Sequence, residues 1–102
     1  MDVTNEWKRQ LRAWASQHDA VRQLWLFGSR VKGGAKPDSD LDIAISLMPA
    51  DWALGKYVAL GDKWQIEIET LIGCKVSFGA IRPGSELDIE VRRTGVLLWA
   101  RP

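Results

Sequence analysis

Two aspartates at the start of an apolar run, Asp40 and Asp42, are the residues best suited to hold a metal ion. The run 41–47, LDIAISL, alternates apolar and polar residues, as a strand with one buried face does. Both carboxylates then point to the same side of the strand. Like charges this close repel unless a cation lies between them, and Mg²⁺ prefers carboxylate and phosphate oxygens. For a bare Asp-x-Asp pair, the alternative is a strand face that simply meets water.

A second group of residues, before these aspartates, is suited to binding phosphate. Gly28 and Ser29 follow the apolar run 24–27, where glycine lets the backbone turn tightly and approach a ligand. Ser29 offers a hydroxyl group, and successive N–H groups in such a turn can bind an anion. Arg30, Lys32 and Lys36 add positive charge suited to phosphate oxygens, although a solvated loop is the alternative for the two lysines. A phosphate-binding turn that faces two metal-binding carboxylates indicates nucleotidyl or phosphoryl transfer.

The elements that must position these residues can be read from periodicity and from turn residues. We expect a first helix capped by Thr4 or Asp2 and a third one capped by Ser85. The expected elements are a helix to residue 18, strands 24–27 and 41–47, a helix 56–72, a strand 75–81, a helix to residue 93 and a strand 96–100, with a loop at 31–39 and a connection at 49–55. This order predicts a single α+β (α/β) domain over residues 1–102, with a mixed sheet of about four strands flanked by helices.

Composition excludes several classes of protein. Net charge is +1 and no basic, aromatic-interleaved strip is present, so nucleic-acid binding is not expected. The start of the chain lacks the apolar core of a signal peptide, and no apolar run is long enough to span a membrane. One cysteine, Cys74, excludes an internal disulfide, so we expect a cytoplasmic protein. The six tryptophans are expected to anchor the core, with Trp52 the best candidate for a partner or nucleobase surface.

The spacing of these motifs resembles a known family. Gly28-Ser29, ten intervening residues and Asp40-x-Asp42 resemble the G-S-x10-D-x-D motif of the DNA polymerase beta nucleotidyltransferase superfamily. The string GSRVKGGAKPDSDLDIAI and the tail from Ile89 to Trp99 are similar to its minimal nucleotidyltransferase (MNT) branch, and so is the nucleotidyltransferase-like order of elements.

This resemblance implies an activity and partners. It implies that Asp40 and Asp42 are catalytic and hold Mg²⁺, and that Gly28 and Ser29 position the triphosphate of ATP or a similar nucleotide, with Arg30 as a further phosphate contact. Many members of this branch are paired with a HEPN-domain partner as the antitoxin of a toxin–antitoxin system, and some transfer AMP to a tyrosine of that partner. The small size of the chain further suggests that a partner or a second copy of the chain completes the substrate pocket.

The match departs from the family at one position. The superfamily usually supplies a third carboxylate from the strand after the second helix, where this chain has Val76-Ser77-Phe78. A serine hydroxyl is a weak Mg²⁺ ligand and a poor general base. The helical acids are expected to lie on solvated faces and cannot be placed at the site from the sequence: Glu67, Glu69, Glu86, Asp88 and Glu90. Two hypotheses therefore stay open, an AMP-transferring enzyme and a catalytically impaired module that acts by binding a partner.

Overall fold

The computed structural model describes residues 2–48 and 53–102. Its elements are α1 (Asn5–Gln17), β1 (Val21–Phe27), α2 (Ser29–Lys32), β2 (Leu41–Leu47), α3 (Ala53–Ile72), β3 (Val76–Ala80), α4 (Glu86–Thr94) and β4 (Val96–Ala100). Most of the predicted connection at 49–55, together with Trp52, lies outside the described residues. No helix in the described ranges has the length and apolar character that crossing a bilayer requires.

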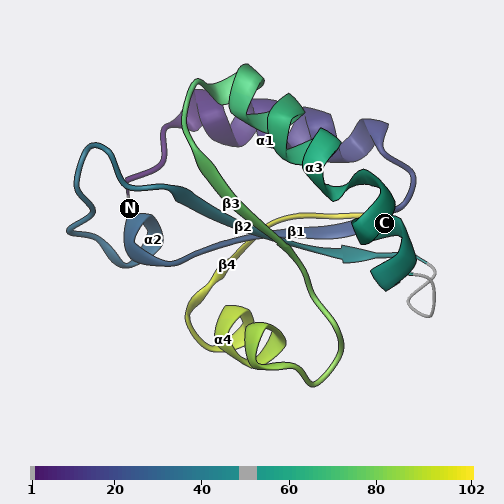
Figure 1. Cartoon of the computed structure of the whole chain (residues 1–102). Helices are drawn as coiled ribbons and strands as arrows, with labels where there is room; N and C mark the ends of the chain where they lie inside the picture. The colour runs from purple at the N-terminus through teal and green to yellow at the C-terminus, as the bar shows by residue number, and fades with distance from the viewer. Residues whose placement is uncertain (1, 49–52) are drawn as a thin grey trace.

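The four strands form one mixed sheet in the order β3-β2-β1-β4. β1 pairs antiparallel with both β2 and β4, whereas β2 and β3 run parallel and are joined through α3. Helices α1 and α3 cover one face of the sheet, and α4 lies against the other (Figure 1). A mixed four-stranded sheet flanked by helices is the predicted fold class, which is confirmed.

The alternating pattern of β2 divides the interior into two layers. Leu41, Ile43, Ile45 and Leu47 are buried in the main core, which α1 and α3 complete. The opposite face carries a smaller cluster around Ala44, packed beneath α4. This smaller cluster covers only part of that face, so polar residues at the start of β2 can remain accessible there.

Both predicted helix caps are present. The Thr4 hydroxyl accepts a hydrogen bond from the N–H of Trp7 at 3.0 Å, and the Ser85 hydroxyl accepts one from the N–H of Asp88 at 3.2 Å. The Asp88 carboxylate in turn accepts a hydrogen bond from the N–H of Gly84 at 2.8 Å. Each cap satisfies an N–H that the first turn of a helix leaves without a partner.

Several element boundaries differ from the prediction. β1 begins at Val21, three residues early, because Val21 pairs with Leu47 and sheet pairing outweighs the polar Arg22 and Gln23. α3 begins at Ala53, and residues 29–32 form one unpredicted helical turn. Near the end of α3, Leu71 is 45% exposed, because the helix turns its neighbour Ile72 toward the core.

Candidate active site

Asp42 lies in the strand that the alternating pattern predicted, and Asp40 directly precedes that strand. Asp42 is the second residue of β2 and is half-buried on the face that α4 partly covers, whereas Asp40 precedes the strand and is exposed. The neighbours of Asp42 in the sheet are Phe27 of β1 and Ser77 of β3. The site therefore sits where the end of β1 and the beginnings of β2 and β3 meet.

Gly28 lies directly against the Asp42 carboxylate. Its backbone has φ +76° and ψ −161°, a region that is essentially restricted to glycine. A Cβ at this position would lie 1.9 Å from Oδ2 of Asp42 and 2.7 Å from its Cγ. The Gly-Ser turn and the aspartate are thus in contact, and a side chain at position 28 would occupy the place of the carboxylate.

The electrostatic environment of Asp42 is unfavourable for its negative charge. Burial raises the pKa of Asp42 above its usual value, and repulsion from Asp40 and then from Glu90 raises it further. A hydrogen bond from the Ser77 side chain opposes these effects and lowers the pKa. The charges of Asp40 and Glu90 therefore both act on Asp42, and a bound cation would relieve this repulsion.

The donor set at this point fits a hard divalent cation in part. Asp40 and Asp42 supply carboxylate oxygens, which suit Mg²⁺. Within residues 2–48 and 53–102, however, no three His, Cys, Asp or Glu side chains converge as a metal-ligand cluster. Two protein carboxylates are enough for a Mg²⁺ ion that also takes phosphate and water ligands, as it commonly does. The residues thus fit a cation that binds together with a nucleotide.

Arg30, predicted to contact phosphate, is buried and bonded to the backbone of the loop before Asp40. Only 8% of the residue is exposed, and its guanidinium lies over the Trp7 ring at 5.3 Å from the centroid. It donates to the backbone carbonyls of Ser39 at 2.9 Å, Pro37 at 3.1 Å and Asp2 at 3.1 Å. These bonds fold the loop that leads into Asp40, so Arg30 acts on the site through that loop. A phosphate contact by Arg30 stays a prediction.

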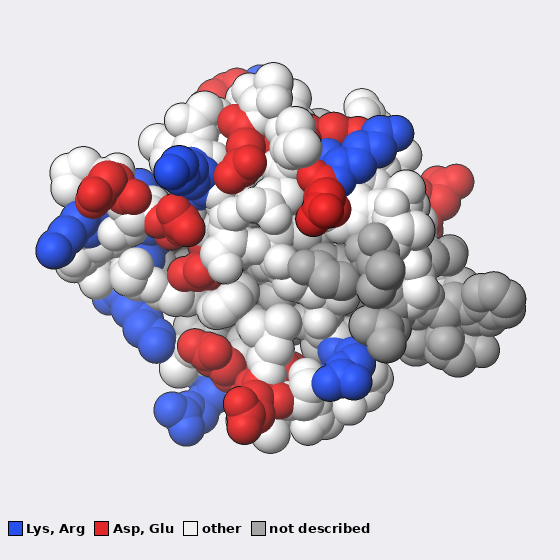
Figure 2. Space-filling model, viewed as in Figure 1, with Lys and Arg blue, Asp and Glu red and all other residues white. Residues whose placement is uncertain are grey.

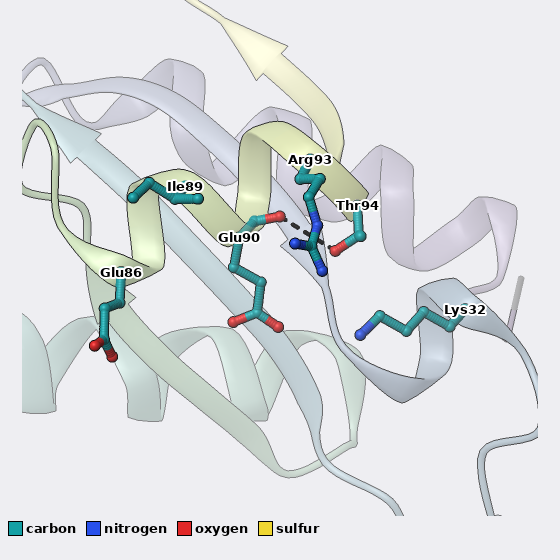
Figure 3. A pocket seen from close by; sticks show the side chains of 6 residues that line it. All are labelled: Lys32, Glu86, Ile89, Glu90, Arg93 and Thr94. Atoms are coloured by element: carbon teal, nitrogen blue, oxygen red, sulfur yellow. Dashed lines mark hydrogen bonds between the residues drawn. The ribbon is translucent and has the colours of Figure 1, made fainter.

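Ser29 and Lys32 are the exposed polar residues of the turn that follows Gly28. Lys32 lines a cleft of about 290 Å³ whose other wall is α4, with Glu86, Ile89, Glu90, Arg93 and Thr94. Lys32, Glu90 and Arg93 point toward one another across this cleft (Figure 3). Figure 2 shows acidic side chains over α4 with basic ones beside them, so the surface at this site is mixed in charge.

Sequence reasoning was wrong about several of the helical acids. Oε1 of Glu67 accepts from the Trp14 indole at 3.1 Å, and Oε2 of Glu69 accepts from the N–H of Val76 at 2.9 Å. Asp88 is 9% exposed and is held by the N–H of Gly84 and by Arg92. These acids are bound in the structure rather than solvated: α3 turns Glu67 and Glu69 toward neighbouring elements, and Asp88 is held within its own helix and cap. Glu86 and Glu90 are exposed, as expected, and line the cleft beside Lys32.

A model of the family described as polymerase beta, nucleotidyltransferase, matches residues 9–101, nearly the whole chain. The chain belongs to the polymerase beta nucleotidyltransferase family. Among curated proteins, none matches the sequence significantly.

Solved structures of this fold include several toxin–antitoxin complexes. One such complex, with AMP-PNP, is 18% identical with a TM-score of 0.71, covering 92% of this chain and 73% of that one. A tri-AMPylated HEPN toxin with its MNT antitoxin, from Shewanella oneidensis, matches at 15% identity and a TM-score of 0.64, covering 93% and 71%. A minimal nucleotidyltransferase is 25% identical with a TM-score of 0.64, covering 87% and 86%. The nucleotidyltransferase fold read from the motif spacing is thereby confirmed.

Proposed function

We propose that this nucleotidyltransferase-family chain is a Mg²⁺-dependent enzyme that transfers AMP from ATP to a hydroxyl group. The observation that carries the proposal is the contact between the Gly28 backbone and the Asp42 carboxylate. That contact joins the expected phosphate-binding turn to the expected metal-binding strand. The repulsion that Asp42 experiences from Asp40 supports it, because a cation would remove that repulsion.

We assign the residues as follows. Asp40 and Asp42 would hold Mg²⁺, which when bound stabilises the charge that develops on the phosphate oxygens. Gly28 and Ser29 would position the triphosphate next to the carboxylates, where the backbone approaches most closely. Arg30 holds the loop before Asp40 and would keep its carboxylate in place.

We further propose a HEPN-domain protein as the acceptor and partner, with this chain as its antitoxin. The support is that the structures similar to this chain include toxin–antitoxin complexes, one with an AMPylated HEPN toxin. The open cleft on the α4 side of the sheet leaves room for an acceptor side chain from another protein, or for a second copy of this chain. We place this activity in a single domain of residues 1–102 in the reducing cytoplasm, where a lone cysteine is common.

Calorimetric titration of ATP, with and without Mg²⁺, tests the site. We expect the wild-type protein to bind ATP only with Mg²⁺, and the Asp42→Asn variant to lose that binding while staying folded. The matched control is Asp38→Asn, in the exposed loop before the pair, which should bind as the wild type does. Equal binding with and without Mg²⁺ would contradict the metal role.

A second function is favoured by one observation, the serine at position 77 beside Asp42. Without a third carboxylate, the chain could act as a partner-binding antitoxin module without transferring AMP. Transfer of label from α-labelled ATP to a HEPN-domain protein distinguishes the two functions. Label on a tyrosine of that protein removes the second function. Tight partner binding without any label, and with transfer gained in Ser77→Asp, would establish it.

A further inference from the structure

Strand β3, together with the residue that precedes it, presents two polar side chains to the aspartate pair. Val76 and Phe78 are buried in the main core. The residues that alternate with them, Lys75 and Ser77, are exposed and lie on the opposite face of the sheet. Asp42 lies on that opposite face too, and Ser77 is its partner in the parallel β2–β3 ladder. The chain therefore brings an ammonium and a hydroxyl group here, and no carboxylate.

Lys75 lies beside Asp40, in the position just before β3. The residues that directly follow these two, Leu41 and Val76, are partners in the ladder. The N–H of Leu41 donates to the carbonyl of Lys75 at 2.9 Å, so the two segments still run side by side at this point. Neighbouring segments of a sheet lie about 4.8 Å apart. The long, flexible side chain of a lysine can span that spacing, so it can reach a ligand that Asp40 holds.

Two adjoining clefts at this end of the sheet contain both residues. One cleft, of about 540 Å³, is lined by Asp40 and Lys75 together with the last turns of α3. The other, of about 450 Å³, is lined by the same two residues together with Trp7 and the loop before Asp40. A ligand that enters either cleft can therefore meet the carboxylate and the ammonium together. The cleft between α2 and α4, which Lys32 lines, contains neither aspartate.

The ammonium group of Lys75 is available for such a ligand. Its side chain is exposed, and among residues 2–48 and 53–102 it takes part in no hydrogen bond or ion pair. The guanidinium of Arg30, by contrast, is buried and already donates to three backbone carbonyls. Lys75 is thus a cation next to Asp40 that the fold itself does not use.

We infer that Lys75 binds a phosphate group of the nucleotide beside Asp40. This inference rests on the proposed function. Ser77 leaves the site without a third carboxylate, and a weaker set of carboxylates attracts less cationic charge to the phosphates. The ammonium of Lys75 offsets part of that loss, because it donates a charge-assisted hydrogen bond to a phosphate oxygen. In the free protein, the same charge repels a divalent cation, so Lys75 favours metal binding together with the nucleotide over metal binding alone.

Two titrations with opposite expected signs test this role. In Lys75→Gln, the affinity for Mn²⁺ alone should rise about two- to fivefold, because a repelling charge is lost. The affinity for ATP at saturating Mg²⁺ should fall about tenfold, because a charge-assisted hydrogen bond to phosphate is lost. Lys75→Arg should stay within about threefold of the wild type in both titrations, since a guanidinium also donates to phosphate.

Lys63→Gln is the matched control. It removes an exposed lysine of α3 that lines a separate cleft, against α1, in which neither aspartate lies. It should leave both affinities unchanged, and thermal unfolding should show that all three variants stay folded. Unchanged ATP affinity or Mn²⁺ affinity that does not rise in Lys75→Gln would overturn the inference, as would an equal effect in Lys63→Gln. A wild type that does not bind ATP with Mg²⁺ would instead refute the proposed function.

Discussion

The contact between Gly28 and Asp42 makes a strong prediction about the substitution Gly28→Ala. An alanine there would adopt a backbone conformation that is essentially restricted to glycine, at a cost of about 2 kcal/mol in unfolding free energy. Its Cβ, 1.9 Å from Oδ2 of Asp42, would also push the carboxylate out of position. We expect the unfolding midpoint to fall by roughly 8–16 °C, at about 4–8 °C per kcal/mol for a domain of this size.

The matched control is Gly34→Ala. Gly34 also has a positive φ, +77°, but a Cβ there meets nothing within 4 Å. This variant should lose about 1 kcal/mol from backbone strain alone and keep the wild-type affinity for ATP. Calorimetry should show that Gly28→Ala loses Mg²⁺-dependent ATP binding at least tenfold more than Gly34→Ala does, about 1.4 kcal/mol. Equal ATP affinity and equal midpoints in the two variants would refute the reasoning about the contact.

Three further substitutions test other parts of the site and its support. Arg30→Lys should lower the free energy of unfolding in denaturant by about 2 kcal/mol, since a lysine cannot donate hydrogen bonds to three carbonyls in one plane. An unchanged midpoint would show that these buried hydrogen bonds contribute nothing to stability. Asp88→Asn should make the free energy of unfolding depend less on pH in acid. The folded pKa of Asp88 is lowered, mainly by the Gly84 N–H, so its stabilising contribution is present above a pH of about 4 and is lost as the pH falls through the folded pKa. Thermal melts from pH 7 to 3 would show the difference. Asp42→Asn should raise the thermal unfolding midpoint of the metal-free protein at pH 7, because the raised pKa of Asp42 means that its ionised form opposes folding. This gain should vanish as the pH falls below about 4. A lower midpoint at pH 7 would contradict the repulsion.

Much of the fold followed from local patterns that tertiary contacts did not overturn. The alternation of β2 predicted which residues lie in the core, because a strand has a strict period of two. The caps Thr4 and Ser85 ended up where the pattern placed them, since each acts over only three residues. The start of β1 could not be predicted, because Val21 owes its strand conformation to Leu47, which is far away in the chain.

Part of the candidate site also followed from the sequence, and part of it only from the tertiary structure. Motif spacing was sufficient to bring together Gly28 and Asp42, because a strand end and the beginning of its paired neighbour must meet. The catalytic and ligand roles of Asp40, Asp42, Gly28, Ser29 and Arg30 stay predictions. The burial of Arg30 could not be read from the sequence, because the three carbonyls that it bonds come from two separate segments of the chain.

The order of residues determined the family, the sheet and the pair of carboxylates, because these depend on periodicity and on short spacings along the chain. Only the tertiary structure decided which acids face the site. The packing of Leu87 and Val91 against the sheet turns Asp88 toward its own cap and leaves Glu90 in the cleft beside Lys32. The side of a helix that meets a distant strand is a property of that packing, and no local pattern records it.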